Sequence, residues 1–440
     1  MKTLIWMTVA AAVLAIVGCN IGAKYSVGGT LTGLTGQGLV LEDNSGNDLA
    51  LASNGAFVFT DGVKNDDAYS VTVKTQPSNP SQTCTVRNGS GTIDMANVTN
   101  VIVSCTQVGR FAYVANQLSN DLSAYAIDST TGALSPVSGS PFASTGTTPA
   151  ALAVDPSGAF IYVANNGSNN VSVYAIDSST GALTSAGVAV ATGSGPVAVT
   201  VDPTDTYLYV ANLASNSVSA YTIDSGSGTL TELSNSPFAV GAEPSSVKVD
   251  PNGNYLYVTD FSDGDVTVLT IDPATGSLSG IAGSPFGAGA GALSIAIDPT
   301  GRFAYVANET AASISQYSIN ASTGSLTAVS GSPLTTGTSP ESLAVDPAGR
   351  YVYAANVTAK NQVAAYSITP SSGALTLSGS PIAAGTFPIS LVLDPSGQFA
   401  YTANDNSNSV SAYAVNATTG VLTAVGTFAA GNAPRSIAID

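Results

Sequence analysis

Four charged residues stand at repeated positions of the chain where most of the equivalent residues are uncharged: Lys248, Glu309, Glu341 and Arg435. A glutamate can act as a general base on water if burial raises its pKa toward neutrality. The chain contains no histidine, so base chemistry at neutral pH would fall to Glu309 or Glu341, with Arg435 as the cationic partner. For binding a ligand without catalysis, the candidates are Lys248, Glu341 and Arg435.

These residues come from three positions of a repeated unit that contains an Asp-Pro turn and a Tyr-Val-Ala-Asn motif. Five residues before the Asp, the copies read Ala150, Val197, Ser245, Leu293, Glu341, Ile389 and Arg435. Two residues before it, they read Ala153, Thr200, Lys248, Ala296, Ala344, Val392 and Ala438. Directly after the Asn, they read Gln117, Asn166, Leu213, Phe261, Glu309, Val357 and Asp405. Because a functional site is asymmetric, these four charges are the candidates for a polar site around one mouth of a central channel. A water-filled channel that tolerates scattered charges is the favoured interpretation.

The repeated unit itself predicts a β-propeller. Its motif tyrosines are spaced 49, 47, 48, 48, 48 and 48 residues apart, at Tyr113, Tyr162, Tyr209, Tyr257, Tyr305, Tyr353 and Tyr401. Each unit contains four strand-like segments, and a period of this length is typical of propeller blades.

The two ends of the repeat predict how the ring closes. The region opens with the second strand of a unit, "GRFAYVAN" from Gly109, and ends with the first strand of a unit, "PRSIAID" at Asp440. The last strand must therefore complete the blade that begins near residue 109. This pairing removes both sheet edges and gives seven blades over residues 108–440.

Residues present in every copy are expected to be scaffold. The motif Asn recurs with Asp260 as its one replacement, and each repeated Asp precedes a turn whose backbone N–H groups it is predicted to bind; the series is Asp155, Asp202, Asp250, Asp298, Asp346, Asp394 and Asp440.

Asp263 and Asp265 flank a glycine and suggest calcium. They fall on a hairpin turn that is shorter than a calcium-binding loop, so a turn is favoured. The sequence predicts no metal and no cofactor.

Composition excludes some classes of protein. The chain has 440 residues, of which 44% are hydrophobic and 9% charged, which is too apolar for a disordered protein. The net charge is −17, and a surface this acidic repels phosphate backbones. We therefore expect no nucleic-acid partner.

The N-terminus resembles a bacterial lipoprotein signal. Residues 1–18 contain Lys2 and an apolar run at 4–17, which suits the core of a signal peptide. The run ends in Ile-Val-Gly directly before Cys19, as in a lipobox, so Cys19 is predicted to be lipidated and residues 19–24 to form a linker. We expect an exported protein anchored in the membrane of the bacterial envelope. The outer membrane is favoured because Asn20, not an aspartate, follows the cysteine. An ordinary signal peptide with a chance cysteine is the alternative.

Residues 25–107 form a separate region with alternating apolar positions and Gly, Asn and Asp turns. This pattern predicts a small antiparallel β-sandwich, with a spacer role. Export leaves Cys84 and Cys105 as an even pair, which predicts a disulfide. A metal site is the poorer alternative, because two cysteines without any histidine make an incomplete ligand set.

Residues 108–440 resemble the seven-bladed lactonase propellers, the family that includes bacterial 6-phosphogluconolactonase, and the related YVTN surface-layer propellers. The resemblance rests on the Asp-Pro-x-Gly turn and on "FAYVAN", "TG" and "GSPF". Lactonases carry Pro-Arg-His on one inner strand and Asn-Glu after the next strand of the same blade. Here Glu309 matches that Glu, but its own blade reads Ala292-Leu293-Ser294. The arginine occurs in the closing blade, as Pro434-Arg435-Ser436, beside Gln117.

Three functions follow as hypotheses. The favoured one is a non-catalytic, lipid-anchored envelope propeller that binds a protein, a glycan or a small ligand, because the lactonase histidine is missing and the chain is acidic. The alternative is a 6-phosphogluconolactonase-like lactone hydrolase that uses Arg435 with Glu309 or Glu341. A surface-layer or adhesion component is a further alternative.

Overall fold

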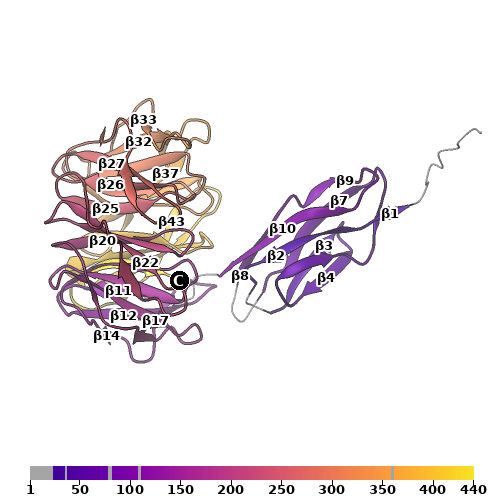
Figure 1. The fold of residues 1–440 in the computed structure, drawn as a ribbon, viewed down its shortest axis with the longest axis horizontal. Coiled ribbons are helices and arrows are strands. Elements are labelled where there is room, and N and C mark those ends of the chain that lie inside the picture. The colour runs from indigo at the N-terminus through magenta and orange to yellow at the C-terminus, as the bar shows by residue number, and fades with distance from the viewer. Residues whose placement is uncertain (1–22, 35–36, 78–81, 108–110, 358–360) are drawn as a thin grey trace, which may run out of the picture. The chain divides into compact units, whose positions relative to one another are not determined.

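A computed structural model describes residues 23–34, 37–77, 82–107, 111–357 and 361–440. The chain divides into two compact units, Met1–Thr106 and Gln107–Asp440 (Figure 1). The predicted signal peptide, Cys19 and the start of the linker lie outside the described residues. Within the described part of the chain, no helix is long and apolar enough to cross a membrane.

The first unit is a β-sandwich. One sheet has the order β5-β2-β10-β8, a second has the order β4-β3-β7-β9, and β1 pairs with β6. The strands are β1 (Lys24–Tyr25), β2 (Val27–Thr32), β3 (Leu39–Asp43), β4 (Asn47–Leu51), β5 (Gly55–Val58), β6 (Val63–Lys64), β7 (Ala68–Thr75), β8 (Gln82–Arg87), β9 (Ser90–Thr92) and β10 (Val98–Gln107). Alternate residues such as Leu39, Leu41, Val101 and Val103 are fully buried between the sheets.

Two features of this unit bear on the sequence predictions. The disulfide between Cys84 and Cys105 is present and joins β8 to β10. The expectation of a wholly antiparallel sandwich was wrong, because β10 pairs with β2 in parallel. Alternation of apolar residues identifies the buried face of a strand but not its neighbour or its direction.

The second unit is a seven-bladed propeller, and we number its blades along the chain from the one that begins at Pro149. The inner strands of blades 1 to 7 are β15 (Pro149–Val154), β20 (Pro196–Val201), β25 (Pro244–Val249), β30 (Ala292–Ile297), β35 (Pro340–Val345), β40 (Pro388–Leu393) and β44 (Pro434–Ile439). The second strands are β16 (Phe160–Asn165), β21 (Tyr207–Asn212), β26 (Tyr255–Asp260), β31 (Phe303–Asn308), β36 (Tyr351–Asn356), β41 (Phe399–Asn404) and β11 (Phe111–Asn116).

The outer half of each blade completes an antiparallel sheet. The third strands are β17 (Asn170–Ile176), β22 (Ser217–Ile223), β27 (Asp265–Ile271), β32 (Ser313–Ile319), β37 (Gln362–Ile368), β42 (Ser409–Val415) and β12 (Asp121–Ile127). The outer strands are β18 (Leu183–Ser185), β23 (Leu230–Glu232), β28 (Leu278–Gly280), β33 (Leu326–Ala328), β38 (Leu375–Leu377), β43 (Leu422–Ala429) and β13 (Leu134–Pro136).

The single outer strand expected from the sequence is split in six of the blades. The second pieces are β14 (Phe142–Ala143), β19 (Val190–Ala191), β24 (Phe238–Ala239), β29 (Phe286–Gly287), β34 (Leu334–Thr335) and β39 (Ile382–Ala383). Five of these six blades carry a proline between the two pieces, and proline cannot donate to a ladder. In blade 6, where no proline interrupts the segment, β43 is continuous.

The predicted closure is confirmed. The last strand, β44, pairs antiparallel with β11, the first strand of the propeller, and Ala112 lies opposite Ile439. The backbone N–H of Phe111 donates to Oδ1 of Asp440 at 2.8 Å. The other six repeated aspartates accept the equivalent N–H five residues on, at 2.6–2.8 Å. These carboxylates are therefore scaffold, as their recurrence predicts.

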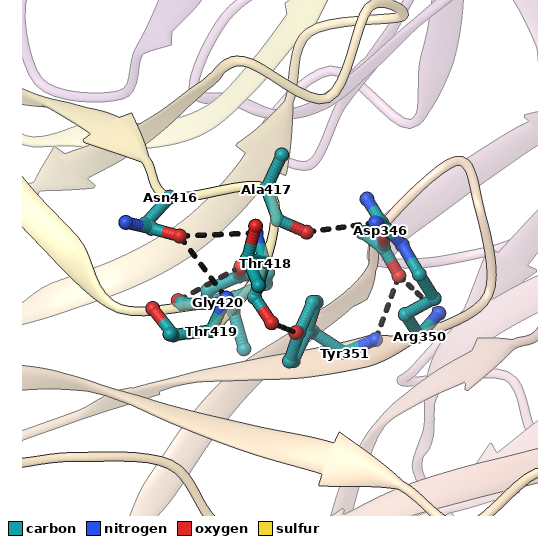
Figure 2. Close-up of polar contacts among 9 residues, drawn as sticks. Asp346, Arg350, Tyr351, Asn416, Ala417, Thr418, Thr419 and Gly420 are labelled. Atoms are coloured by element: carbon teal, nitrogen blue, oxygen red, sulfur yellow. Dashed lines mark hydrogen bonds and ion pairs between the residues drawn. The ribbon is translucent and has the colours of Figure 1, made fainter.

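Neighbouring blades are joined by hydrogen bonds from the second strand of one blade to a turn of the next blade. Figure 2 shows the contact of blade 5 with blade 6, where the hydroxyl of Tyr351 donates to the carbonyl of Thr418 at 2.5 Å and Arg350 donates to the carbonyl of Ala417 at 2.7 Å. The hydroxyl of the motif tyrosine, Tyr353, donates to the carbonyl of Gly420 at 3.0 Å. Gly420 has φ +70°, and a Cβ there would collide with the ring of Tyr351, so this turn requires glycine.

The hydrogen bond of the motif tyrosine Tyr353 has equivalents at most of the other contacts between blades. Equivalent hydroxyl-to-carbonyl bonds of 2.9–3.3 Å join five other pairs of blades. The motif asparagines are also internal: Asn212, Asn308 and Asn404 each donate to a serine hydroxyl seven residues on. Both repeated residue types hold the blades rather than a ligand.

Candidate functional site

The inner strands of the propeller surround two cavities that meet at a ring of serines. The first, which we call the Glu341 cavity, is about 380 Å³ and is lined by Glu341 and Arg435 together with uncharged residues. The second, the Lys248 cavity, is about 400 Å³ and is lined by Lys248 and Thr200 among small and apolar residues. Ser246, Ser294 and Ser342 line both cavities.

A β-bulge explains why Glu341 and Arg435 reach the first cavity. The register of every inner strand with its neighbour skips one residue, so that Pro340 faces Asn356, Ser342 faces Ala355, and Glu341 is the extra residue. Arg435 is skipped in the same way in blade 7. A bulged residue is released from the ladder and its side chain is re-aimed. The bulge recurs in all seven blades, but only these two copies carry a charge.

Each bulged residue lies next to the loop of the preceding blade, because β31 contacts β35 and β41 contacts β44. The residue that follows the motif Asn in one blade is thereby matched with the bulged residue of the next. The matched positions are Gln117 and Ala150, Asn166 and Val197, Leu213 and Ser245, Phe261 and Leu293, Glu309 and Glu341, Val357 and Ile389, and Asp405 and Arg435.

Arg435 has a partner that the sequence prediction missed. Its Nη1 lies 3.4 Å from Oδ2 of Asp405, and the two side chains are 38% and 14% exposed. Asp405 stands at the same repeated position as Glu309, so a comparison of the seven copies contained the signal. Its role depends on a pair across the blade boundary, which a comparison of single positions does not reveal.

The other charged pair is a pair of acids. Glu341 is half-buried, and desolvation raises its pKa to about 7, with a smaller contribution from the negative charge of Glu309. The guanidinium of Arg435 acts in the opposite direction and limits this rise. At neutral pH Glu341 therefore exchanges readily between its acid and its carboxylate form. Glu309 influences Glu341 electrostatically, and its Oε2 accepts a hydrogen bond of 3.0 Å from the hydroxyl of Thr310.

The hypothesis that all four charges surround one mouth was wrong for Lys248. Lys248 lines the second cavity only, whereas Glu341 and Arg435 line only the first. The reason is strand geometry: Lys248 stands three residues further along its inner strand than the bulged position, and a strand advances about 10 Å over three residues. The side chain of Lys248 is exposed within this cavity, and desolvation by the surrounding strands lowers its pKa.

The described residues contain no group of three or more cysteine or acidic side chains arranged to hold a metal ion. Asp263 and Asp265 lie where β26 turns into β27, around Gly264 with φ +69°. The Glu341 cavity thus offers a carboxyl group whose pKa is about 7, from Glu341, and a guanidinium, from Arg435.

Comparisons with known proteins agree with this architecture. The family described as "Lactonase, 7-bladed beta-propeller" matches residues 48–249 and 239–439. No curated protein matches the chain. Among solved structures, a 6-phosphogluconolactonase candidate from Bacteroides uniformis is 21% identical with a TM-score of 0.68, over 76% of this chain and 100% of its own.

A second solved structure is the periplasmic gluconolactonase PpgL from Pseudomonas aeruginosa. It is 21% identical with a TM-score of 0.65, over 75% of this chain and 98% of its own. At these identities the solved structures establish a shared fold. The family match, which spans most of the chain, establishes more: this protein belongs to the lactonase family of seven-bladed β-propellers.

Proposed function

We propose that the propeller hydrolyses a lactone in the Glu341 cavity. The observation that carries this proposal is the half-buried Glu341, whose pKa is raised to about 7, beside a guanidinium in the same cavity. The alternative hypothesis from the sequence thereby gains over the non-catalytic one. The missing histidine had been the argument against it, and a glutamate with this pKa can replace a histidine as general base.

The chemistry assigns one role to each group. The carboxylate of Glu341 removes a proton from a water molecule as that water attacks the lactone carbonyl. Arg435 faces the oxyanion that forms on the carbonyl oxygen and stabilises its charge. When the ring C–O bond breaks, the proton held by Glu341 passes to the departing alkoxide, which leaves a hydroxy acid. No step requires a metal or a cofactor.

The charges of the site favour an unphosphorylated substrate. Glu309, Glu341 and Asp405 supply three acidic groups against one guanidinium, and that guanidinium already has Asp405 as its partner. A phosphate group would meet repulsion without a free cation in this cavity. We therefore infer a neutral sugar lactone as the substrate class, which is also the class that the name of the Pseudomonas aeruginosa relative indicates for that protein.

The test is hydrolysis of glucono-δ-lactone at pH 6.5, followed by proton release against the spontaneous rate. The wild-type chain is expected to accelerate ring opening, and Glu341→Gln to lose about 100-fold or more, since a positioned general base contributes about that much. Glu232→Gln, on the outer strand β23, is the matched control and should keep full activity. If neither glucono-δ-lactone nor any other neutral lactone is opened, the hydrolase proposal fails.

A binding module remains the second candidate, and one observation favours it. The ion pair with Asp405 neutralises Arg435, which weakens its pull on a carbonyl oxygen and suits a groove that recognises a neutral ligand such as a glycan. In that case sugars would bind to the wild-type chain without turnover, and Glu341→Gln would change affinity only modestly. The surface-layer alternative predicts ordered assemblies of the purified chain instead.

We further propose export with a lipid anchor on Cys19 and a location at the outer membrane, based on the signal-like residues 1–18. A simple measurement tests cleavage at this point. Trp6 is the only tryptophan of the chain, so processed protein should show tyrosine emission alone. Tryptophan emission from the membrane-anchored form, or incorporation of labelled fatty acid into a Cys19→Ser variant, would contradict this proposal.

A further inference from the structure

The Lys248 cavity contains a cation without a counter-ion. Among the described residues, no carboxylate forms an ion pair with Lys248, and its pKa is lowered by desolvation alone. The equivalent residue is Ala, Thr or Val in the other six blades, so the blades do not require a lysine here. The side chain of Lys248 is exposed within this cavity, so its unpaired ammonium can meet a ligand that enters there.

The serine ring shows how the edges of the inner strands are normally covered. An inner strand is the edge of its blade, so some of its N–H groups have no partner in the ladder. In four places the hydroxyl of a serine accepts such an N–H from the next blade at 3.1–3.2 Å. These bonds run from Leu343 to Ser294, from Leu391 to Ser342, from Ile437 to Ser390 and from Leu152 to Ser436.

Next to Lys248 this cover is missing. At the serine position, blades 1 and 2 carry Ala151 and Ala198, which have no acceptor. The repeat places these alanines opposite the N–H groups of Val199 and Val247. For neither N–H is a side-chain acceptor found in the part of the chain that the structure describes. Both valines, both alanines and Lys248 line the same cavity.

These observations converge on one ligand chemistry. The ammonium of Lys248, which is exposed within the cavity, supplies a positive charge, and the uncovered N–H groups of Val199 and Val247 supply two fixed donors. Ser246 lies two residues from Lys248 on β25, hence on the same side of the strand, and adds a hydroxyl. Charged and fixed neutral donors around a small cavity are the features of an oxyanion site.

We propose that the Lys248 cavity binds a small oxyanion, of the carboxylate or phosphate type, at a site separate from the Glu341 cavity. The proposal does not depend on the lactonase activity, because the two cavities share only serines and no charged residue. The exclusion of phosphate from the first cavity also does not extend to the second, where no acid lines the wall.

Isothermal titration with inorganic phosphate and with acetate tests this site and separates the two sources of the charge. The wild-type chain should bind at least one of them, and Lys248→Met should bind it about tenfold or more weakly, since a bond to a charged group is lost. Ala198→Ser provides the sharper variant. It keeps the lysine but offers the N–H of Val247 the same hydroxyl cover as in four other blades, and should weaken binding a few-fold.

Two controls make the outcome decisive. Lys74→Met removes a lysine of the first unit that is paired with Asp48 at 2.6 Å, and should leave binding unchanged. Glu341→Gln should also leave it unchanged, which would show that the cavities act separately. The proposal is overturned if the wild-type chain binds neither anion, or if Lys248→Met binds as tightly as the wild type.

Discussion

The repeated framework and the lining of the Glu341 cavity are built from the same strands, yet they differ in how the seven copies vary. In the framework, the aspartate before each turn and the motif tyrosine are the same in every blade. Their hydrogen bonds recur with nearly the same lengths, except that the hydroxyl of Tyr162 has no partner among the described residues. In the lining, the bulged position runs from alanine to arginine. Within one repeat unit, the recurrent residues hold the fold, and the unmatched positions are those to which we assign the proposed chemistry.

The contrast sharpens at two matched pairs of the lining. Glu309 with Glu341 and Asp405 with Arg435 occupy the same two positions, two blades apart. In the first pair two acids meet, and burial, with a smaller contribution from Glu309, raises the pKa of Glu341, whereas the second pair is an ion pair. The backbone is the same in both, because both bulged residues are skipped in the register. The two pairs therefore differ in the charge of the bulged residue and not in the backbone that holds it.

The largest expected effect comes from making the two pairs alike. Glu341→Arg would place a guanidinium beside Glu309, as Arg435 lies beside Asp405. Lactone hydrolysis should fall by about 100-fold or more because the general base is gone. The melting temperature should change little, because the fold already accommodates an arginine at this bulge in blade 7. Rates measured at saturating lactone, with Glu232→Arg as the control, test this prediction; retained activity would remove Glu341 from the mechanism.

The framework should respond in the opposite way. Asp394→Ala removes a carboxylate that is 2% exposed and accepts the N–H of Phe399 at 2.7 Å. A buried donor is left without a partner, so the free energy of unfolding should fall by about 2 to 3 kcal/mol. Hydrolysis per folded molecule should stay at the wild-type value. Urea titration of the variant, beside Asp94→Ala in the first unit, measures the loss; a loss of activity larger than the loss of folded protein would contradict the division of tasks.

This division also explains what the sequence could predict. The period near 48 residues predicts blades, and the phase of Gly109 and Asp440 predicts closure, because both depend only on recurrence. Glu341 and Arg435 could be picked out as unmatched charges for the same reason. The bulge that aims them into the cavity could not, because an extra residue in a ladder leaves no mark on residue type.

Lys248 and Asp405 show the remaining limit. The sequence groups Lys248 with Glu341 because both are rare charges on inner strands, and only the length of the strand separates them into two cavities. The sequence does not reveal Asp405 as the partner of Arg435, because that role depends on the blade that follows in space. In both cases the missing information is a distance across strands, which a one-dimensional pattern does not contain.

Blade 3 offers a test inside the framework, where Asp260 replaces the motif asparagine. Burial, and next the charge of Asp265, raise the pKa of Asp260 to about 7, although the hydroxyl of Thr267 donates to it at 2.6 Å. The folded state thus favours the protonated form more than the unfolded state does. Protonated Asp260 therefore contributes to the free energy of unfolding. This contribution is fully present below about pH 4 and is lost as the pH rises through about 7.

Asp260→Asn should remove this pH dependence. The amide would donate to Asp265 as Asn116 donates to Asp121 at 2.7 Å in blade 7. At pH 8 the variant should be more stable than the wild type by about 1 to 2 kcal/mol, and near pH 4 the difference should vanish. Thermal unfolding at both pH values measures it. An equal gain at pH 4 and pH 8 would show that the charge of Asp260 is not the cause.

The smallest expected effect concerns the neighbour of Glu341. Glu309→Gln removes the negative charge that contributes, after burial, to the raised pKa of Glu341, so that pKa should fall. Because the base must be ionised, the rate of hydrolysis rises with pH through the pKa of Glu341, and the whole rise should move to lower pH. At pH 6 the variant should be a few-fold faster than the wild type, and at pH 8 the two should be equal.

The pH profile of kcat/KM, with Glu232→Gln as control, distinguishes this shift from direct catalysis by Glu309, which would lower the rate at every pH. A shift without loss would confine Glu309 to tuning the pKa of its neighbour, and would leave Glu341 as the general base of the proposed reaction, with Arg435 as its cationic partner.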